Sequence, residues 1–255
     1  MKKLLVFTIT LTMALSLCSC GAKEETPEST ASSQTTSSQT TEAVKELSPA
    51  EQLLEDVRGT YDELFTVICD PKYDQIWLDK CEAIVGADMA EMCADMLKSA
   101  CTGNLYGEDA VKAYDNPEEA QFDCYFINGV HQFVFDGSHI SGLDENGNEV
   151  FSHEYAFVKD FSLGGVMDGY LYETSDADAG EFQYFVMFPD TPSTTYHIEF
   201  RYGSDAEAMT LYDEGPLAYW LAAGIPADRD QQLIENVIQL FCEENLAGME
   251  MEDAA

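Results

Sequence analysis

Apolar side chains recur every three to four positions between residues 48 and 103, which is the period of an α-helix. Ser48, Pro49 and Glu51 form a helix start, because they supply a capping hydroxyl, a proline at the first helical position and an acid at the third. We predict three helices, from residue 48 to about 68, from 70 to 86 and from about 88 to 103. The inward side of the first is formed by Leu53, Leu54, Val57, Tyr61, Leu64, Phe65 and Ile68.

From about Gln121 the pattern changes to a period of two, as in a half-buried β-strand. Phe122, Cys124 and Phe126 alternate with polar neighbours, and Asp136-Gly137 is a typical hairpin turn. The pattern predicts about seven strands at hairpin spacing, which indicates an antiparallel sheet closed as a small barrel. These strands include residues 149–158, 166–174, 182–188 and 195–202.

After Gly203 the helical period returns, in residues 205–212, 217–222 and 228–245. We therefore expect one α+β domain over residues 48–255. Its predicted parts are helices within 48–115, the barrel within 120–203 and further helices within 205–245.

The N-terminus is typical of a secretory signal sequence. Two lysines precede an uncharged run over residues 4–17. As a helix this run covers about 21 Å, which is short of the roughly 30 Å hydrocarbon core of a membrane. It ends in Leu17-Cys18-Ser19-Cys20-Gly21, which resembles a lipobox. That resemblance implies that residues 1–19 are removed and that Cys20 carries a lipid.

Residues 20–47 are rich in Ser, Thr, Gln, Glu and Pro and contain almost no large apolar side chain. They cannot bury enough surface to offset the entropy of ordering, so we interpret them as a flexible tether. The domain is then expected on the extracytoplasmic face of the cell membrane, held there through the N-terminal lipid.

Replacing Cys20 with alanine tests this anchor. Because the substitution removes the acceptor thiol, we expect Cys20→Ala to yield an uncleaved or secreted protein without lipid. Labelling cells with a radioactive fatty acid measures the outcome, and unchanged labelling of the variant refutes the assignment.

Composition narrows the classes of partner. The chain has 48 acidic and 12 basic residues, a formal net charge of −36 at pH 7. This charge argues against nucleic acid and against direct binding of anionic headgroups. It favours the attraction of cations, although the commoner meaning of such a charge is a soluble, self-repelling surface.

Six cysteines fall in the predicted domain. Outside the cytoplasm such an even set allows several disulfide pairings, which the sequence cannot rank. Three of the six lie on apolar helical stripes, so buried free thiols are the alternative. None forms a Cys-x-x-Cys pair, which removes support for a zinc ribbon or a thioredoxin-type site. The six are Cys69, Cys81, Cys93, Cys101, Cys124 and Cys242.

The sequence contains neither a Gly-x-Ser-x-Gly nucleophile elbow nor a glycine-rich phosphate loop, so we do not expect an enzyme.

Among the histidines, His197 has neighbours that could bind a metal ion together with it. Between Tyr196 and Tyr202, apolar residues take one face of the strand, while His197, Glu199 and Arg201 take the other.

If this polar face looks into the barrel, the imidazole of His197 and the carboxylate of Glu199 converge on one point. Asp190, just before the turn at Pro192, would add a third ligand from the preceding strand. One imidazole nitrogen and carboxylate oxygens suit zinc or a harder divalent ion such as manganese. The alternative is an outward polar stripe in which Arg201 pairs with Glu199.

Several stretches resemble the ZinT family of extracytoplasmic zinc-binding domains. The likeness is densest between residues 165 and 226 and extends upstream through Gly59-Thr60-Tyr61 and residues 74–77. It is carried by Glu173-Thr174-Ser175-Asp176-Ala177-Asp178-Ala179-Gly180-Glu181-Phe182-Gln183-Tyr184, by residues 200–203 and by Asp205-Ala206-Glu207-Ala208.

The resemblance implies a lipocalin-like (calycin-type) barrel that binds zinc through a Ser-Asp-His turn and a His-x-His strand pair. The turn matches residues 188–190, where Asp190 stands in place of the family's histidine. The pair matches His197 and Glu199, so Glu199 replaces the second histidine. Two carboxylates and one imidazole should bind zinc more weakly and shift preference toward harder ions.

These features lead to one hypothesis and one rival. The hypothesis is an extracytoplasmic lipoprotein that binds a divalent metal ion, zinc before others, and buffers it or delivers it to an ABC-type importer. The rival is a metal-free lipocalin-like module that binds a small apolar ligand or a protein partner.

Overall fold

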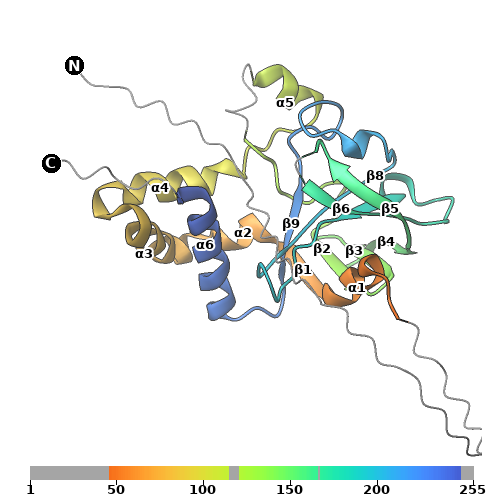
Figure 1. Ribbon diagram of the computed structural model, residues 1–255, viewed down its shortest axis with the longest axis horizontal. Helices are drawn as coiled ribbons and strands as arrows, with labels where there is room; N and C mark the ends of the chain where they lie inside the picture. The colour runs from red at the N-terminus through yellow and green to blue at the C-terminus, as the bar shows by residue number, and fades with distance from the viewer. Residues whose placement is uncertain (1–45, 115–120, 166, 248–255) are drawn as a thin grey trace, which may run out of the picture.

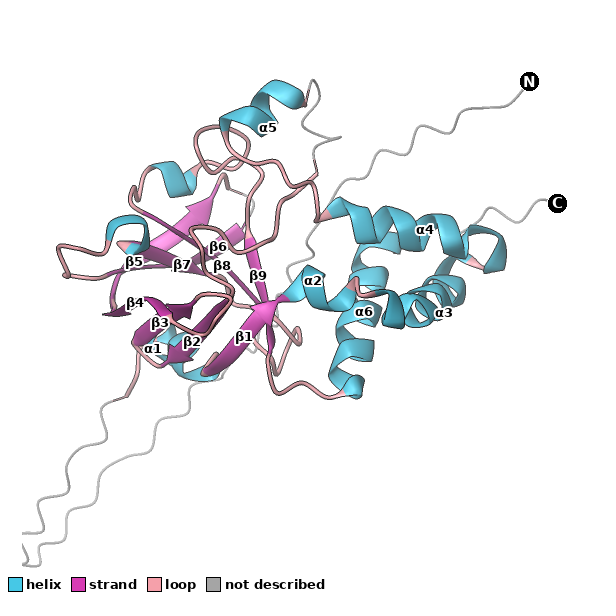
Figure 2. Ribbon diagram, turned by 180° about the vertical axis from the view of Figure 1, so that it is seen from behind, coloured by secondary structure: helices cyan, strands magenta, loops and turns pink. Residues whose placement is uncertain are grey.

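The computed structural model describes residues 46–114, 121–165 and 167–247 (Figure 1). The predicted signal sequence, Cys20 and the predicted linker up to residue 45 lie outside the described residues. Figures 1 and 2 show a curled sheet with helices gathered along one side of it. Within the described residues, no helix is both long and apolar enough to cross a membrane.

One antiparallel sheet holds the nine strands of the described chain, in the order β4-β3-β2-β1-β9-β8-β7-β6-β5. It curls into a half-barrel that stays open, with β4 and β5 as its edges, whereas the sequence predicted a closed barrel. The strands are β1 (Gly59–Glu63), β2 (Gln132–Asp136), β3 (His139–Leu143), β4 (Glu149–Glu154), β5 (Ala156–Leu163), β6 (Met167–Glu173), β7 (Tyr184–Met187), β8 (Ile198–Gly203) and β9 (Ala222–Pro226).

Aromatic rings fill the interior of the curled sheet. Phe133 of β2 lies 6.0 Å from Phe185 of β7 and 4.9 Å from Phe200 of β8, measured between ring centroids. All three rings are fully buried. Because opposite walls of the half-barrel meet through these rings, burial of aromatic surface is the main force that holds the curl together.

A second core lies between the outer face of the sheet and a helical layer. Its buried residues come from the helices and from the side of the sheet turned toward them, among them Trp77, Val186 and Ile238. The helices of this layer are α2 (Leu64–Ile68), α3 (Asp74–Val85), α4 (Ala87–Ala100) and α6 (Gln231–Leu246), with the short helix η1 (Pro71–Tyr73) before α3.

The remaining helices lie outside this layer. They are α1 (Pro49–Asp56), α5 (Glu108–Ala113), η3 (Gly180–Phe182) and η4 (Ala208–Thr210). The predicted start of α1 is confirmed, since Ser48 and Glu51 form a reciprocal capping box. The predicted break at Gly86 is also confirmed, because Gly86 separates α3 from α4 with φ of 80°, a conformation that favours glycine.

The helix predicted from residue 48 to about 68 is wrong in its middle. The chain leaves α1 after Asp56, forms β1, and returns to a helix only at Leu64. Tyr61 is the inward residue of β1 and lies opposite Phe133 and Pro226. The spacing of Val57, Tyr61 and Leu64 imitated a helical stripe although Tyr61 is buried from a strand.

The helices predicted at 205–212 and 217–222 are also wrong. The first stretch contains only η4, and the second leads into β9, which lies between β1 and β8. The Ala-Ala-Gly-Ile-Pro sequence of β9 hid this strand, because small residues and proline are uncommon in strands. At Gly224 a Cβ atom would lie 3.1 Å from Tyr61 Cβ and 3.2 Å from Ile198 Cγ1, so the small residue permits close packing.

Residues 122–126 do not form the predicted strand. Phe122, Cys124 and Phe126 are buried, but the segment has only isolated bridges, which join Asp123 to Thr102 and to Trp220. The alternation of apolar residues therefore reflects a buried connection rather than a member of the sheet.

Candidate metal site

Strand β8 separates the two cores. Ile198, Phe200 and Tyr202 point into the aromatic interior, and Glu199 and Arg201 lie on the opposite face, toward the helical layer. The condition under which His197 and Glu199 would converge inside the barrel, a polar face turned to its interior, is therefore not met. Burial of three large apolar side chains outweighs the placement of two charged ones in the interior.

His197 immediately precedes β8 and is held by its neighbours. Its Nδ1 lies 2.7 Å from the carbonyl oxygen of Thr195, and its Nε2 lies 3.4 Å from Oε1 of Glu199. The side chains of His197 and Glu199 are each only 12% exposed. Tyr196 adopts a φ of 67°, an uncommon conformation for a bulky residue, at the bend that leads into His197.

Asp190 belongs to the segment between β7 and β8. Burial, followed by the negative charge of Glu199, raises the pKa of the Asp190 carboxyl to about 6. The imidazole of His197 and a hydrogen bond from Thr195 oppose this rise, whereas Glu244 adds to it. The structure therefore places Asp190 in the electrostatic field of the other two predicted residues.

The pKa of the His197 imidazole is raised as well, although burial opposes this rise. Burial alone would lower the pKa of His197, but the hydrogen bond and charge of Glu199, the charge of Asp190 and the Thr195 carbonyl together raise it to about 9. The protonated, positively charged form of His197 is thus favoured.

Glu244, near the end of α6, is a further member of the cluster that the sequence reasoning missed. Burial raises its pKa, the charge of His197 lowers it, and Glu199 and Glu243 raise it further. The signal for it was weak, because Glu244 follows Val237 by seven positions and so falls beside the inward stripe of the helix, but the residue itself is exposed.

The donor atoms suit a divalent ion, but their spacing does not form a complete shell. Asp190, His197, Glu199 and Glu244 offer one imidazole and three carboxylates, a set compatible with zinc or manganese. Within the part of the chain that the structure describes, no three His, Cys, Asp or Glu side chains form a group placed to hold a metal ion. The described site is therefore a His–Glu pair with two further carboxylates in its field.

Arg201 is separate from this cluster. Its guanidinium is fully buried and donates to the carbonyl oxygens of Trp220 at 2.8 Å, Met209 at 3.1 Å, Leu211 at 2.7 Å and Leu217 at 2.9 Å. The alternative in which Arg201 pairs with Glu199 on an outward stripe is not what the structure has. Arg201 instead ties the segment before β9 to β8.

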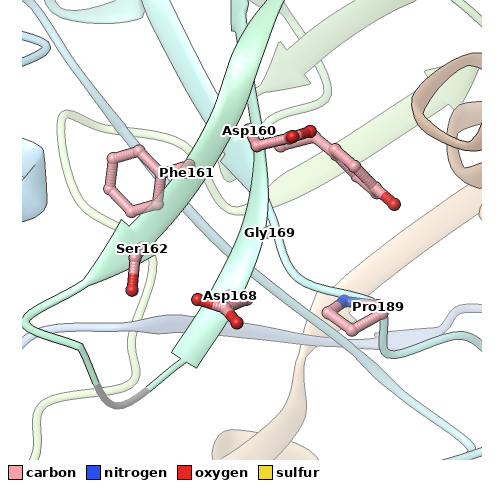
Figure 3. A pocket seen from close by; sticks show the side chains of 7 residues that line it. Asp160, Phe161, Ser162, Asp168, Gly169 and Pro189 are labelled. Carbon is pink, nitrogen blue, oxygen red and sulfur yellow. The ribbon is translucent and has the colours of Figure 1, made fainter.

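An open pocket of about 520 Å³ is lined in part by Pro189, the residue before Asp190, but none of the predicted ligands lines it. Figure 3 shows Asp160 and Ser162 on one strand and Asp168 on the next, with Pro189 beside them. These polar residues are exposed on β5 and β6. The candidate metal site is therefore distinct from this pocket.

Comparison with known proteins gives a distant likeness only. No protein-family model matches the chain, and no curated protein does. Two solved structures resemble it: Zn(II)-bound AdcA from Streptococcus pneumoniae, with TM-score 0.45 and 16% identity, and the Zn(II)-bound ZinT-like domain of the same AdcA, with TM-score 0.44 and 17% identity. The matches cover 73% and 76% of this chain, and 34% and 89% of those chains.

Proposed function

We propose that this chain binds a divalent metal ion, zinc before manganese, at the His197–Glu199 pair, and that Asp190 moves toward this pair to complete the site. The observation that carries the proposal is the orientation of the His197 ring. Its Nδ1 faces the carbonyl oxygen of Thr195, which makes Nδ1 the protonated nitrogen in the neutral ring and directs Nε2 toward Glu199. Metal-binding histidines are commonly oriented in this way, with the second ring nitrogen donating to a backbone carbonyl.

The charge of the cluster supports the same proposal. When ionised, Asp190, Glu199 and Glu244 carry three negative charges against at most one positive charge on His197. Arg201 does not offset them, because its donors are taken up by four carbonyl oxygens. Asp190 and Glu199 are shielded from solvent while Glu244 is exposed at the edge of the cluster, and shielded excess charge is costly, so the cluster takes up either protons or a cation. The raised pKa values of Asp190 and Glu244 reflect the uptake of protons.

A metal-free carrier of a small apolar ligand has less support. The space in which a lipocalin-like module would hold such a ligand is occupied by Phe133, Phe135, Phe185 and Phe200, each at most 2% exposed. A cargo could enter only if this core were displaced, which would sacrifice much of the apolar burial that holds the sheet.

For the cellular role, we propose that the domain buffers the metal outside the cytoplasm or delivers it to an ABC-type importer. The lipobox-like sequence around Cys20 and the tether behind it support an anchored position. The strong negative charge of the chain would attract cations toward it.

Thermal unfolding tests the proposed site. Zinc or manganese should raise the melting temperature, because a ligand of the folded state stabilises it by mass action. His197→Ala should abolish this rise. His153→Ala is the matched control, since the His153 side chain is also 12% exposed and its Nδ1 lies 2.8 Å from a carboxylate oxygen of Asp176. A metal-dependent rise that survives in His197→Ala, or disappears in His153→Ala, contradicts the assignment.

The rise should also depend on pH. Protons compete with the metal for His197, with pKa about 9, and for Asp190, with pKa about 6, so the rise should grow from pH 6 to pH 9 and be lost near pH 5. The metal-free protein should show the opposite trend in this range. A raised histidine pKa stabilises the fold fully below about pH 6.5, and that stabilisation is lost as the pH rises through 9.

A further inference from the structure

The cysteines of the domain fall into two groups. Cys81 of α3, Cys93 of α4 and Cys242 of α6 are fully buried in the helical layer. The other three interact near the segment that connects the helices to the sheet: Cys69, Cys101 and Cys124. This separation removes most of the pairings that the sequence left open.

Within the first group one pair stands out. The Sγ atoms of Cys81 and Cys242 lie 3.7 Å apart, in a buried thiol–thiol contact between α3 and α6. A disulfide requires about 2.05 Å between the sulfur atoms, so small side-chain and helix shifts of about 1.7 Å in total would close the bond. The charge of Cys81 raises the pKa of Cys93, and the charge of Cys93 raises the pKa of Cys242. The close sulfur–sulfur contact, however, is between Cys81 and Cys242.

We propose that Cys81 and Cys242 form a disulfide when the chain folds in the presence of a disulfide oxidant. This inference does not depend on the proposed metal site. Cys81 and Cys242 are 161 positions apart in sequence, so the bond would join the first long helix of the domain to its last. A cross-link over so long a loop restricts the unfolded chain strongly and should stabilise the fold.

The reaction is a two-electron exchange with an oxidant such as glutathione disulfide. One cysteine thiolate attacks the oxidant and releases one glutathione thiolate, which leaves a mixed disulfide. The second cysteine thiolate then attacks the mixed disulfide, forms the Cys81–Cys242 bond and releases the second glutathione. The two cysteine protons end on the two glutathione thiols, so the protein is oxidised and the oxidant is reduced.

Burial decides when this reaction can take place. Both side chains have 0% exposure in the folded protein, so an oxidant must reach them before folding is complete. Either sulfur can be the donor in the thiol–thiol hydrogen bond, and burial acts to raise the pKa of both thiols. Either cysteine can therefore be the first attacking thiolate.

Refolding of the full chain tests the proposal. The reduced chain is unfolded in guanidinium, refolded with glutathione and glutathione disulfide, alkylated and mapped by mass spectrometry. A glutamate-specific protease combined with trypsin is suitable, because Lys72 and Lys80 lie between Cys69 and Cys81, and Glu82 and Glu91 lie between Cys81 and Cys93. We expect the peptides of Cys81 and Cys242 to be linked in the monomer. Absence of this link, or a link of either cysteine to Cys93 instead, overturns the proposal.

Thermal unfolding provides the second readout. Reduction should lower the melting temperature of the refolded wild type by roughly 5–10 °C. Cys81→Ala and Cys242→Ala should show no such difference between oxidising and reducing conditions, and Cys93→Ala, equally buried, should keep it. Each variant is compared with itself, so the cost of a buried substitution cancels. A difference that persists in Cys81→Ala contradicts the pairing.

Discussion

Replacing Phe200 with alanine is expected to lower the free energy of unfolding by about 3–5 kcal/mol. The ring is fully buried and lies 4.9 Å from the ring of Phe133, 5.6 Å from that of Phe135 and 6.1 Å from that of Phe185. Its removal leaves a cavity between the two walls of the half-barrel, and the surrounding rings can close it only in part. Denaturant unfolding followed by circular dichroism measures the loss.

Phe157→Ala is the control for this prediction. Phe157 is also on a strand and contacts the rings of Tyr170 and Tyr172, but its side chain is 42% exposed on the edge strand β5. The loss should therefore be about 1 kcal/mol or less. Equal losses for Phe157→Ala and Phe200→Ala would show that the interior rings are not the main support of the curled sheet.

Replacing Arg201 with alanine is expected to cost about 3 kcal/mol or more. The substitution removes the donors of four hydrogen bonds and leaves the carbonyl oxygens of the segment before β9 unpaired in a buried region. The loss is limited because a buried charge is removed as well; its burial lowers the pKa of Arg201 to about 10, opposed in part by Tyr212. Hydrogen exchange should accelerate first in residues 209–221.

Arg201→Lys distinguishes the role of geometry from that of charge. Lysine keeps the positive charge, but its ammonium is a point donor and cannot reproduce the planar fork that reaches four carbonyls. We expect a loss closer to that of alanine than to that of the wild type. Full stability of Arg201→Lys would contradict the importance of the fork.

The sequence predicted correctly those helices and strands whose ends or faces depend on neighbouring residues alone. The capping residues before α1 and the glycine between α3 and α4 fixed those boundaries, and period-two runs identified β2, β3, β6, β7 and β8. The single strand predicted over residues 149–158 was wrong, because the chain forms β4 up to Glu154 and a separate strand β5 from Ala156. β1 and β9 escaped prediction for opposite reasons. The apolar spacing around Tyr61 fits a helix, and Ala-Ala-Gly-Ile-Pro fits no strand preference, so only pairing with distant strands decides both.

For the candidate site, the alternation along β8 correctly put His197, Glu199 and Arg201 apart from the apolar residues. It could not say which face meets the barrel interior, because both faces of this strand are buried. The alternation also could not predict that Arg201 binds backbone carbonyls instead of Glu199. Those carbonyls belong to residues 209–220, which form no strand or long helix that a pattern could reveal. Glu244 enters the cluster only through the packing of α6.

The separation of Arg201 from Glu199 matters for function. The only guanidinium on this face of β8 is directed to backbone carbonyls, so the described carboxylates around His197 keep their excess negative charge. A cation that enters the cluster would be stabilised by that charge and would replace the proton of His197 beside Glu199, with no ion pair of Arg201 to break.

Calorimetric titration of zinc and of manganese into metal-free protein tests the central claim most directly. We predict one site per chain with micromolar or tighter affinity for wild type and for His153→Ala at pH 7.5. His197→Ala should weaken the affinity by roughly 100-fold or more, because it removes the nitrogen ligand itself. If the wild type takes up neither ion at micromolar concentration, or if His197→Ala binds as tightly as the wild type, the proposed metal site is wrong.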